Sequence, residues 1–330
     1  MRILVISHDE VKQLLRMNDC VELMSRTLAT LARDQAINPL RQGMWLPEKV
    51  GVLGMMPAAL LADPQLVGIK VITVFPGNHG TDYDCHQGAV MIFDTTHGRP
   101  LAIVDASAIT EIRTAAVSAV ATQALARPDA HVLTILGSGV QARSHLLALA
   151  ESMDIRDVRV WSRNRDRAQK LVDTVGPQLS SRPTMTVAQT VQAAVEGSEI
   201  ICTTTASADP VLLGEWLENG QHINAVGASV AFARELDTGA VVRSKLYVDR
   251  RESAENEAGE FLSAKRDGAL DETHIRGDLG QVLIGELPGR ESADEITLFK
   301  SLGLAVEDLA SAHHVFVKAQ EQGIGSSVEL

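Results

Sequence analysis

The 330-residue chain contains few cysteines and no excess of positive charge. Its three cysteines, Cys20, Cys85 and Cys202, are isolated and lack Cys-x-x-Cys spacing. This pattern argues against a disulfide framework and a zinc site, and it favours a reducing, cytoplasmic compartment without a bound metal. With 30 basic and 42 acidic residues, the net charge of −12 predicts no nucleic-acid partner and no anionic membrane partner.

Long apolar runs are also absent from the sequence. No segment approaches the roughly 18 uninterrupted apolar residues of a membrane span. Residues 1–20 carry charges in place of the apolar centre of a signal peptide. A hydrophobic content of 45% and a charged content of 22% are typical of a soluble globular protein, and the length suits two domains.

The most informative segment is a Gly-x-Gly-x-x-Ala pattern that follows the apolar run 131–136. Gly137 permits a tight turn, Gly139 leaves room for a pyrophosphate, and Ala142 allows close packing of helix and strand. A helical pattern over 142–150 follows directly, so its N-terminus would present free N–H groups to the anion. The segment therefore predicts a dinucleotide-binding loop, whereas the alternative is a purely structural strand-to-helix turn.

The tip of the next strand, residues 158–161, bears on the choice of cofactor. In an NAD-binding unit, an acidic residue would hold the ribose hydroxyls at this point. Here Ser162, Arg163 and Asn164 follow the strand without an acid. A hydroxyl and a guanidinium suit a 2′-phosphate, so the tip favours NADP(H), with NAD(H) as a possible cofactor. The alternative is a solvated basic loop that does not discriminate.

Strand and helix patterns alternate through the second half of the chain, which predicts an α/β fold with a doubly wound parallel sheet. The polar, glycine-containing segment 76–88 is a candidate active-site loop, and the tail 323–330 is expected to fray. Strands are predicted at 3–6, 51–56, 67–75, 89–94, 101–105, 131–136, 158–161, 200–204, 222–227 and 246–249, and helices at 7–15, 18–33, 110–126, 142–150 and 297–322.

Three basic residues in the first part of the chain call for explanation. Lys70 is the only charged residue in the apolar strand 67–74, and a solvent-facing lysine is the simplest interpretation. Arg113 falls in the first turn of the helix predicted at 110–126, where it opposes the helix dipole unless an anion binds there. The alternative for Arg113 is pairing with a surface acid, and Arg41, in an extended segment, carries no signal by itself.

Many segments together resemble the ornithine cyclodeaminase/mu-crystallin family over nearly the whole chain. Their order and spacing make the resemblance specific, and it is closest to the mu-crystallin, or ketimine reductase, branch. The segments are 39–41, 53–57, Lys70, 86–88, 113–116, 137–142, 161–164, 224–228, 234–237 and 299–303.

The resemblance implies a Rossmann-type domain and a second α/β domain built from both ends of the chain. Residues 1–118 and 300–330 are expected to form the substrate-binding and dimerisation domain, and 119–299 the dinucleotide-binding domain. A homodimer is expected.

The resemblance also implies the roles of individual residues. Arg41 and Arg113 are expected to hold a substrate carboxylate, with Lys70 near the reacting carbon and nitrogen. Met56 and His86 are expected to line the substrate site. The residues expected to bind the cofactor are Gly137, Gly139, Val140, Gln141, Ser162, Arg163, Asn164, Thr203, Thr204, Val226, Gly227, Ser301 and Thr114.

One departure from the family concerns the type of reaction. Ser229 stands where the cyclodeaminases carry an Asp, and an ordinary hydroxyl does no acid–base work near neutral pH. The implied function is therefore NAD(P)H-dependent reduction of an imino acid, such as Δ1-pyrroline-2-carboxylate or Δ1-piperideine-2-carboxylate. The alternatives are an alanine dehydrogenase-like amino-acid dehydrogenase, an ornithine cyclodeaminase, and a non-catalytic NADPH-dependent small-molecule binding protein.

Overall fold

A computed structural model describes residues 2–78 and 81–329 of the chain. The chain forms two compact units, of which unit 1 comprises Met1–Arg113 and Leu304–Leu330, and unit 2 comprises Thr114–Gly303. The division falls inside helix α3, Ala106–Leu125. Both divisions lie a few residues from the predicted domain boundaries, after 118 and before 300.

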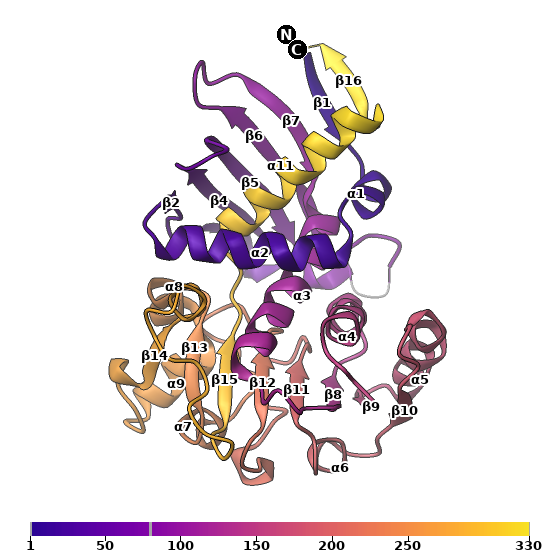
Figure 1. Ribbon diagram of the computed structural model, residues 1–330, viewed down its shortest axis with the longest axis vertical. Helices are drawn as coiled ribbons and strands as arrows, with labels where there is room; N and C mark the ends of the chain where they lie inside the picture. The colour runs from indigo at the N-terminus through magenta and orange to yellow at the C-terminus, as the bar shows by residue number, and fades with distance from the viewer. Residues whose placement is uncertain (1, 79–80, 330) are drawn as a thin grey trace. The chain divides into compact units, whose positions relative to one another are not determined.

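Unit 1 is built on a mixed sheet with the strand order β16-β1-β7-β6-β5-β4-β2, in which β3 also pairs with β4. Strand β1 runs parallel to β7, and the other pairs are antiparallel. Helix α11 lies along strands β4 to β7 (Figure 1). The elements are β1 (Arg2–Ile6), α1 (His8–Leu14), α2 (Met17–Ala32), β2 (Ala36–Ile37), β3 (Gln42–Trp45), β4 (Val52–Leu60), β5 (Leu66–Val74), β6 (His86–Asp94), β7 (Pro100–Asp105), α11 (Ala305–Gln322) and β16 (Ser326–Glu329).

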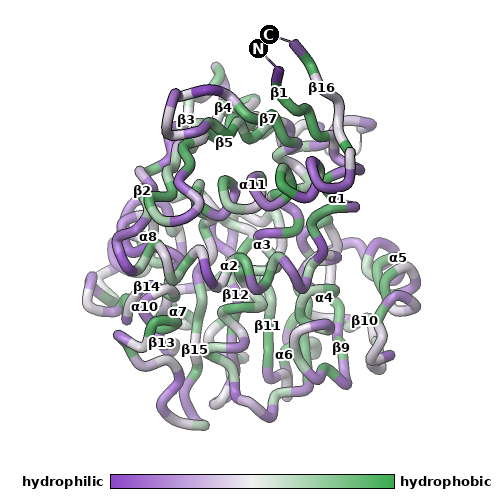
Figure 2. Tube along the Cα trace, turned by 45° about the horizontal axis from the view of Figure 1, so that its top comes forward, coloured by the Kyte–Doolittle hydropathy of each residue, from purple (hydrophilic) through white to green (hydrophobic). Residues whose placement is uncertain are grey.

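Alternation along these strands separates two faces of the sheet. In β5, Gly68, Lys70 and Ile72 are buried on the face toward α11, whereas Ile69 lies on the other face and is partly exposed. The strands β5 and β7 are largely hydrophobic along their length (Figure 2). A partly exposed apolar row crosses five strands in register, and its members are Pro57, Ile69, Met91, Ile103 and Val5.

Unit 2 contains an eight-stranded, all-parallel sheet with the order β10-β9-β8-β11-β12-β15-β13-β14. Numbered along the chain within this unit, the order is 3-2-1-4-5-8-6-7, and its first five positions follow the 3-2-1-4-5 order of a Rossmann fold, so the predicted doubly wound parallel sheet is confirmed. The strands are β8 (Val132–Leu136), β9 (Asp157–Trp161), β10 (Thr184–Val187), β11 (Ile200–Thr203), β12 (His222–Ala225), β13 (Lys245–Val248), β14 (Ile275–Asp278) and β15 (Thr297–Lys300), and the helices are α4 (Val140–Ser152), α5 (Arg165–Val175), α6 (Val191–Val195), α7 (Thr238–Val242), α8 (Arg251–Glu257), α9 (Gly259–Arg266) and α10 (Leu279–Leu283).

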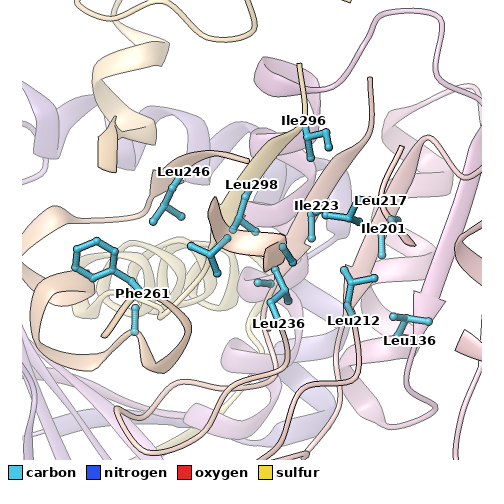
Figure 3. Close-up of a cluster of buried hydrophobic side chains, with 14 of the residues drawn as sticks. Leu136, Ile201, Leu212, Leu217, Ile223, Leu236, Leu246, Phe261, Ile296 and Leu298 are labelled. Atoms are coloured by element: carbon cyan, nitrogen blue, oxygen red, sulfur yellow. The ribbon is translucent and has the colours of Figure 1, made fainter. Parts of the chain in front are cut away.

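A continuous apolar cluster packs against this parallel sheet (Figure 3). Ile201, Ile223 and Leu298 come from three neighbouring strands and are almost completely buried. Leu212 and Leu236 are brought to the same cluster by an isolated parallel bridge between the segments that carry them. The segments that follow the strands are therefore fixed to the core of unit 2.

Three sequence-based expectations about secondary structure were wrong. Helix α3 begins at Ala106 in place of Thr110, because Asp105 Oδ1 accepts the N–H of Ala108 at 2.7 Å and so caps the helix earlier. The expected helix 297–322 is the buried strand β15 followed by α11, since residues 297–300 pair with strands on both sides. The tail is ordered over 326–329, where β16 pairs with β1.

Candidate functional site

Lys70 is the centre of a buried polar cluster in unit 1. The residue is only 3% exposed, so the solvent-facing interpretation of this lysine was wrong. Its Nζ donates to Thr110 Oγ1 at 2.7 Å and to both carboxylate oxygens of Asp308 at 3.2 Å. Met56, expected beside the substrate, is the direct cross-strand partner of Lys70 and is also buried.

The surroundings of Lys70 make its ammonium group easier to deprotonate. Burial is the largest cause and lowers the pKa of Lys70 to about 8, and the positive charges of Arg113 and Arg41 act in the same direction. The carboxylate of Asp308 opposes this change, because an adjacent negative charge stabilises the ammonium form. Burial of the amine therefore lowers the pKa of Lys70 more than the neighbouring arginines do.

Arg113 is joined to the same cluster through two carboxylates. Its Nε donates to Asp308 Oδ1 at 2.9 Å, and its Nη1 donates to Glu307 Oε2 at 2.9 Å. Because α3 begins at Ala106, Arg113 lies two turns into the helix and not in its first turn. The expectation that its charge lies at a helix N-terminus was therefore wrong, and its buried position depends on these carboxylates.

Glu307 and Asp308 are the residues of this cluster that sequence reasoning missed. Both lie in the first turns of α11, and their side chains are fully buried. Acids at a helix N-terminus are ordinary, since they complement the dipole, and the sequence separates them from Lys70 by more than two hundred residues. The sequence offers only an adjacent acidic pair at the start of the helix, which does not identify its partners.

The other residues expected at the substrate site lie at the margins of the cluster. Arg41 is half-buried in the extended segment before β3, and its charge contributes to the lowered pKa of Lys70. His86 is the first residue of β6, so the expected loop 76–88 ends earlier than predicted, and residues 79–80 lie outside the described residues. Although His86 as a whole is exposed, partial burial of its ring and the charge of Lys70 lower its pKa.

In unit 2, glycine occurs at positions 137 and 139 for two different structural reasons. Gly137 has a φ of +136°, and a Cβ there would approach Thr204 Oγ1 to 2.6 Å. Gly139 has an ordinary φ of −89° at the N-cap of α4, and a Cβ there would meet no atom within 4 Å. Because neither conformation nor packing requires Gly139, the open space at this helix N-terminus fits the pyrophosphate of a dinucleotide. Val140 and Gln141 form the first turn of the same helix.

The tip of β9 keeps the composition expected from the sequence. Ser162 Oγ lies 2.9 Å from Ser138 Oγ, which joins this tip to the glycine loop. Asn164 caps α5, since its Oδ1 accepts the N–H of Arg167 at 3.0 Å. Arg163 is exposed and makes no ion pair among the residues that the structure describes. Its guanidinium is therefore available to an anion.

The remaining residues expected to bind the cofactor lie mostly at one edge of the parallel sheet. Thr203 ends β11 and Thr204 follows it, Val226 and Gly227 follow β12, and Ser301 follows β15. Carboxyl ends of parallel strands form the ligand-binding edge of such sheets. Thr114 is the exception, because it lies within α3, where it is buried.

Known proteins resemble this chain along nearly its whole length. The chain matches the sequence model of the Ornithine cyclodeaminase/mu-crystallin family over residues 1–323. The ketimine reductase mu-crystallin of Mus musculus is 38% identical over 315 residues, which cover 94% of this chain and 96% of that relative. The chain belongs to the ornithine cyclodeaminase/mu-crystallin family.

Solved structures of similar proteins extend this comparison. Thermococcus litoralis Δ1-pyrroline-2-carboxylate reductase, in complex with NADH and L-proline, has a TM-score of 0.95 and 35% identity, covering 99% of this chain and 100% of that chain. An archaeal alanine dehydrogenase dimer with bound NAD has a TM-score of 0.94 and 31% identity, covering 100% of both chains. This member of the ornithine cyclodeaminase/mu-crystallin family thus shares its fold with nicotinamide-binding enzymes.

Among residues 2–78 and 81–329, no three or more His, Cys, Asp or Glu side chains are grouped so that they could hold a metal ion. Within the same part of the chain, no helix has both the length and the hydropathy needed to cross a membrane.

Proposed function

We propose that this protein is an NAD(P)H-dependent reductase of an imino acid, with a cyclic ketimine as its substrate. The best candidates are Δ1-pyrroline-2-carboxylate and Δ1-piperideine-2-carboxylate. The observation that carries the proposal is the buried lysine of unit 1, joined to Arg113 through Asp308, in a chain whose unit 2 carries a dinucleotide-binding edge. Known relatives are a ketimine reductase and a pyrroline-2-carboxylate reductase, which supports this choice of substrate.

The chemistry requires one hydride and one proton. A bound nicotinamide cofactor would supply the hydride for the imine carbon, and the carbon–nitrogen double bond would become a single bond. Protonation of the ring nitrogen makes that carbon more electrophilic, and Lys70 is the group proposed to exchange this proton. With a pKa of about 8, the Lys70 ammonium is largely protonated at neutral pH and still able to release its proton.

The carboxylate of the substrate would be held by the basic residues of unit 1. Arg41 and Arg113 are proposed to bind it, which fixes the reacting carbon relative to the hydride donor. Arg113 already uses Nε and Nη1 on Asp308 and Glu307. These contacts hold the guanidinium of Arg113 in place, and we propose that it binds the substrate carboxylate together with Arg41.

We also propose that the enzyme prefers NADP(H), because Ser162 and Arg163 stand at the tip of β9 without an acid. Arg163→Ala should raise the Michaelis constant for NADPH and leave that for NADH nearly unchanged. The lost charge-assisted contact corresponds to about 1.5–3 kcal/mol, or roughly tenfold to a hundredfold. Lys170→Ala, which removes an exposed positive charge on α5 outside the tip of β9, is the matched control and should leave both constants unchanged. A wild-type preference for NADH would contradict the proposal.

The experiment that tests the proposed function compares ketimine reduction with two alternative activities. NADPH oxidation is measured with the two cyclic ketimines and with 2-oxo acids plus ammonia, and ammonia release is measured with L-ornithine and catalytic NAD. We expect turnover with the ketimines and no ammonia release from ornithine, since Ser229 replaces the cyclodeaminase Asp. Faster turnover of 2-oxo acids would favour an amino-acid dehydrogenase, and tight NADPH binding with no turnover would favour a non-catalytic binding protein.

We further propose a cytoplasmic homodimer. The three cysteines are free thiols, as expected in a reducing compartment.

The partly exposed apolar row across the sheet of unit 1, which includes Ile69 and Met91, suits burial against the same surface of a second copy. An isologous interface of this kind uses one surface patch on both chains.

A further inference from the structure

Glu235 is a buried carboxylate that joins two strand-end segments of unit 2. It has 0% exposure, and each of its oxygens accepts two hydrogen bonds. Oε2 accepts from Thr203 Oγ1 at 2.8 Å and from the N–H of Gly227 at 2.6 Å. Oε1 accepts from Thr205, through its N–H at 2.6 Å and its Oγ1 at 2.7 Å. One side chain thus connects the segment after β11 to the segment after β12.

The two segments are held very close together at this carboxylate. A Cβ on Gly227 would lie 2.0 Å from the carbonyl oxygen of Thr205 and 2.5 Å from Glu235 Oε1. Only glycine fits at 227, since a methyl group would push the segments apart. The spacing between the two strand ends therefore depends on the Glu235 carboxylate and on the absence of a side chain at 227.

The backbone of Glu235 is itself anchored, so the carboxylate has a fixed position. Its N–H donates to Glu260 Oε1 at 3.0 Å, and its carbonyl accepts from the N–H of Leu212 at 3.0 Å. Glu260 in turn forms an ion pair with Lys300 at 3.1 Å, and Lys300 also donates to the carbonyl of Ala228. The arrangement thus extends to the end of β15, directly before Ser301.

The position of these segments in the sheet indicates which part of a dinucleotide they would serve. A Rossmann sheet consists of two mononucleotide-binding halves that meet where the strand order reverses. Strands β8, β9 and β10 form the half with the glycine loop, and β11, β12 and β15 form the other half, which takes the nicotinamide mononucleotide. Among residues 2–78 and 81–329, the hydrogen-bond donors to the Glu235 carboxylate, Thr203, Thr205 and Gly227, all belong to segments of the second half.

We infer that Glu235 is a positioning residue for the nicotinamide half of the cofactor site. It acts through Thr203 and Gly227 by fixing the spacing of the segments that carry them. The inference rests on the cofactor-binding part of the proposed function and is independent of the imine substrate.

The test compares a whole cofactor with a fragment that lacks the nicotinamide riboside. Glu235→Gln keeps the shape of the side chain, but its amide nitrogen cannot accept the hydrogen bonds that one carboxylate oxygen accepts. Calorimetric dissociation constants are measured for NADPH and for 2′,5′-ADP, with NADH and ADP in parallel so that the result does not depend on phosphate preference. We expect the variant to bind the whole cofactor about tenfold more weakly. The fragment should bind within twofold of the wild-type constant.

Two further variants keep the test decisive. Asp237→Asn is the matched control: this carboxylate, two residues along, accepts the N–H groups of Gly214 and Ala240, and both of its constants should stay unchanged. Thr205→Ala removes one donor to Glu235 and should show a smaller loss that is again confined to the whole cofactor, even if Glu235→Gln fails to fold.

The inference would be overturned if Glu235→Gln weakened the binding of cofactor and fragment equally, or weakened the binding of neither. Glu235 would then be a general support of the fold. Wild-type protein that binds neither ligand would overturn it together with the cofactor proposal. Normal binding in wild type without turnover of any imine would contradict only the proposed reaction.

Discussion

At the scale of single residues, the buried cluster of Lys70, Arg113, Glu307 and Asp308 needs a reason to exist. Two positive and two negative side chains are withdrawn from water, with exposures of 5% or less. Buried ion pairs of this kind contribute little net stability, because desolvation offsets their attraction. Retaining four charged groups in an interior is better explained by the chemistry proposed for Lys70 and Arg113 than by the stability of the fold.

The roles of Lys70 and Arg113 predict different kinetic defects. Lys70→Met keeps the length and removes the donor, so cofactor binding should persist while turnover falls by about 10²–10⁴-fold. Arg113→Lys keeps the charge but loses the planar fork, so it should mainly raise the Michaelis constant for the imine. Steady-state kinetics of both variants, with NADPH binding as the control, check this contrast. Wild-type turnover by Lys70→Met would show that the lysine is structural.

The lowered pKa of Lys70 predicts a basic limit to activity. If Lys70 donates the proton, imine reduction should be full below about pH 8 and should fall as the pH rises above that value. Asp308 stabilises the ammonium form, so Asp308→Asn should move this midpoint to lower pH. The pH profile of kcat/KM measures both effects. Thr110→Val, which removes a neutral contact to the same amine, should move the midpoint less. A midpoint that stays fixed in Asp308→Asn, or rises, would contradict this assignment.

At the scale of elements, the glycine loop and five of the eight parallel strands were predictable because their signals are local. Strands β8, β9, β11, β12 and β13 were all expected near their observed positions. Their apolar runs and intervening helical patterns lie within short windows of sequence. Strand β15 was not predicted, because its four residues lie shortly before helix α11 and resemble a continuation of that helix. Its strand conformation depends on pairing with β12 and β13, which no local pattern records.

The two acids in the polar cluster of unit 1 show the same limit of prediction from local sequence patterns. The basic residues Lys70 and Arg113 attracted attention because each conflicts with its local surroundings. Glu307 and Asp308 do not conflict with theirs, since acids suit the start of a helix. Their function depends on the approach of α11 to β5, a long-range contact that joins opposite ends of the chain. The sequence therefore predicted one half of the cluster.

The two glycines of the 137–142 loop predict a clean separation of stability from binding. Gly137→Ala forces a side chain onto a φ of +136° and against Thr204, so it should lower the free energy of unfolding by about 1–3 kcal/mol. Gly139→Ala meets open space and should leave that free energy nearly unchanged, while NADPH binding is lost. Urea unfolding without cofactor and calorimetry with NADPH measure the two effects. Normal NADPH binding by Gly139→Ala would rule out the proposed pyrophosphate position.

At the scale of the whole molecule, the apolar face of the sheet in unit 1 predicts the oligomeric state. Ile69 and Met91 are direct cross-strand neighbours at the centre of the partly exposed row. Placing a lysine at either position would bury a charge in the proposed interface, so Ile69→Lys and Met91→Lys should be monomeric by light scattering. Val242→Lys is the control, because Val242 is 43% exposed on α7 of unit 2 and lies outside the row. Dimeric Ile69→Lys and Met91→Lys, or a monomeric wild type, would refute the proposed interface.

The reaction itself, hydride transfer to the imine carbon, is tested most directly by following the hydride. Wild-type protein is incubated with Δ1-pyrroline-2-carboxylate and NADPH that carries deuterium at the transferable position of the nicotinamide ring, and the product is examined by mass spectrometry and NMR. We predict L-proline with one deuterium at the α-carbon, formed in equal amount to the oxidised cofactor. Cofactor oxidation without label in proline, or no oxidation with either cyclic ketimine, would contradict the assignment of this protein as an imino-acid reductase.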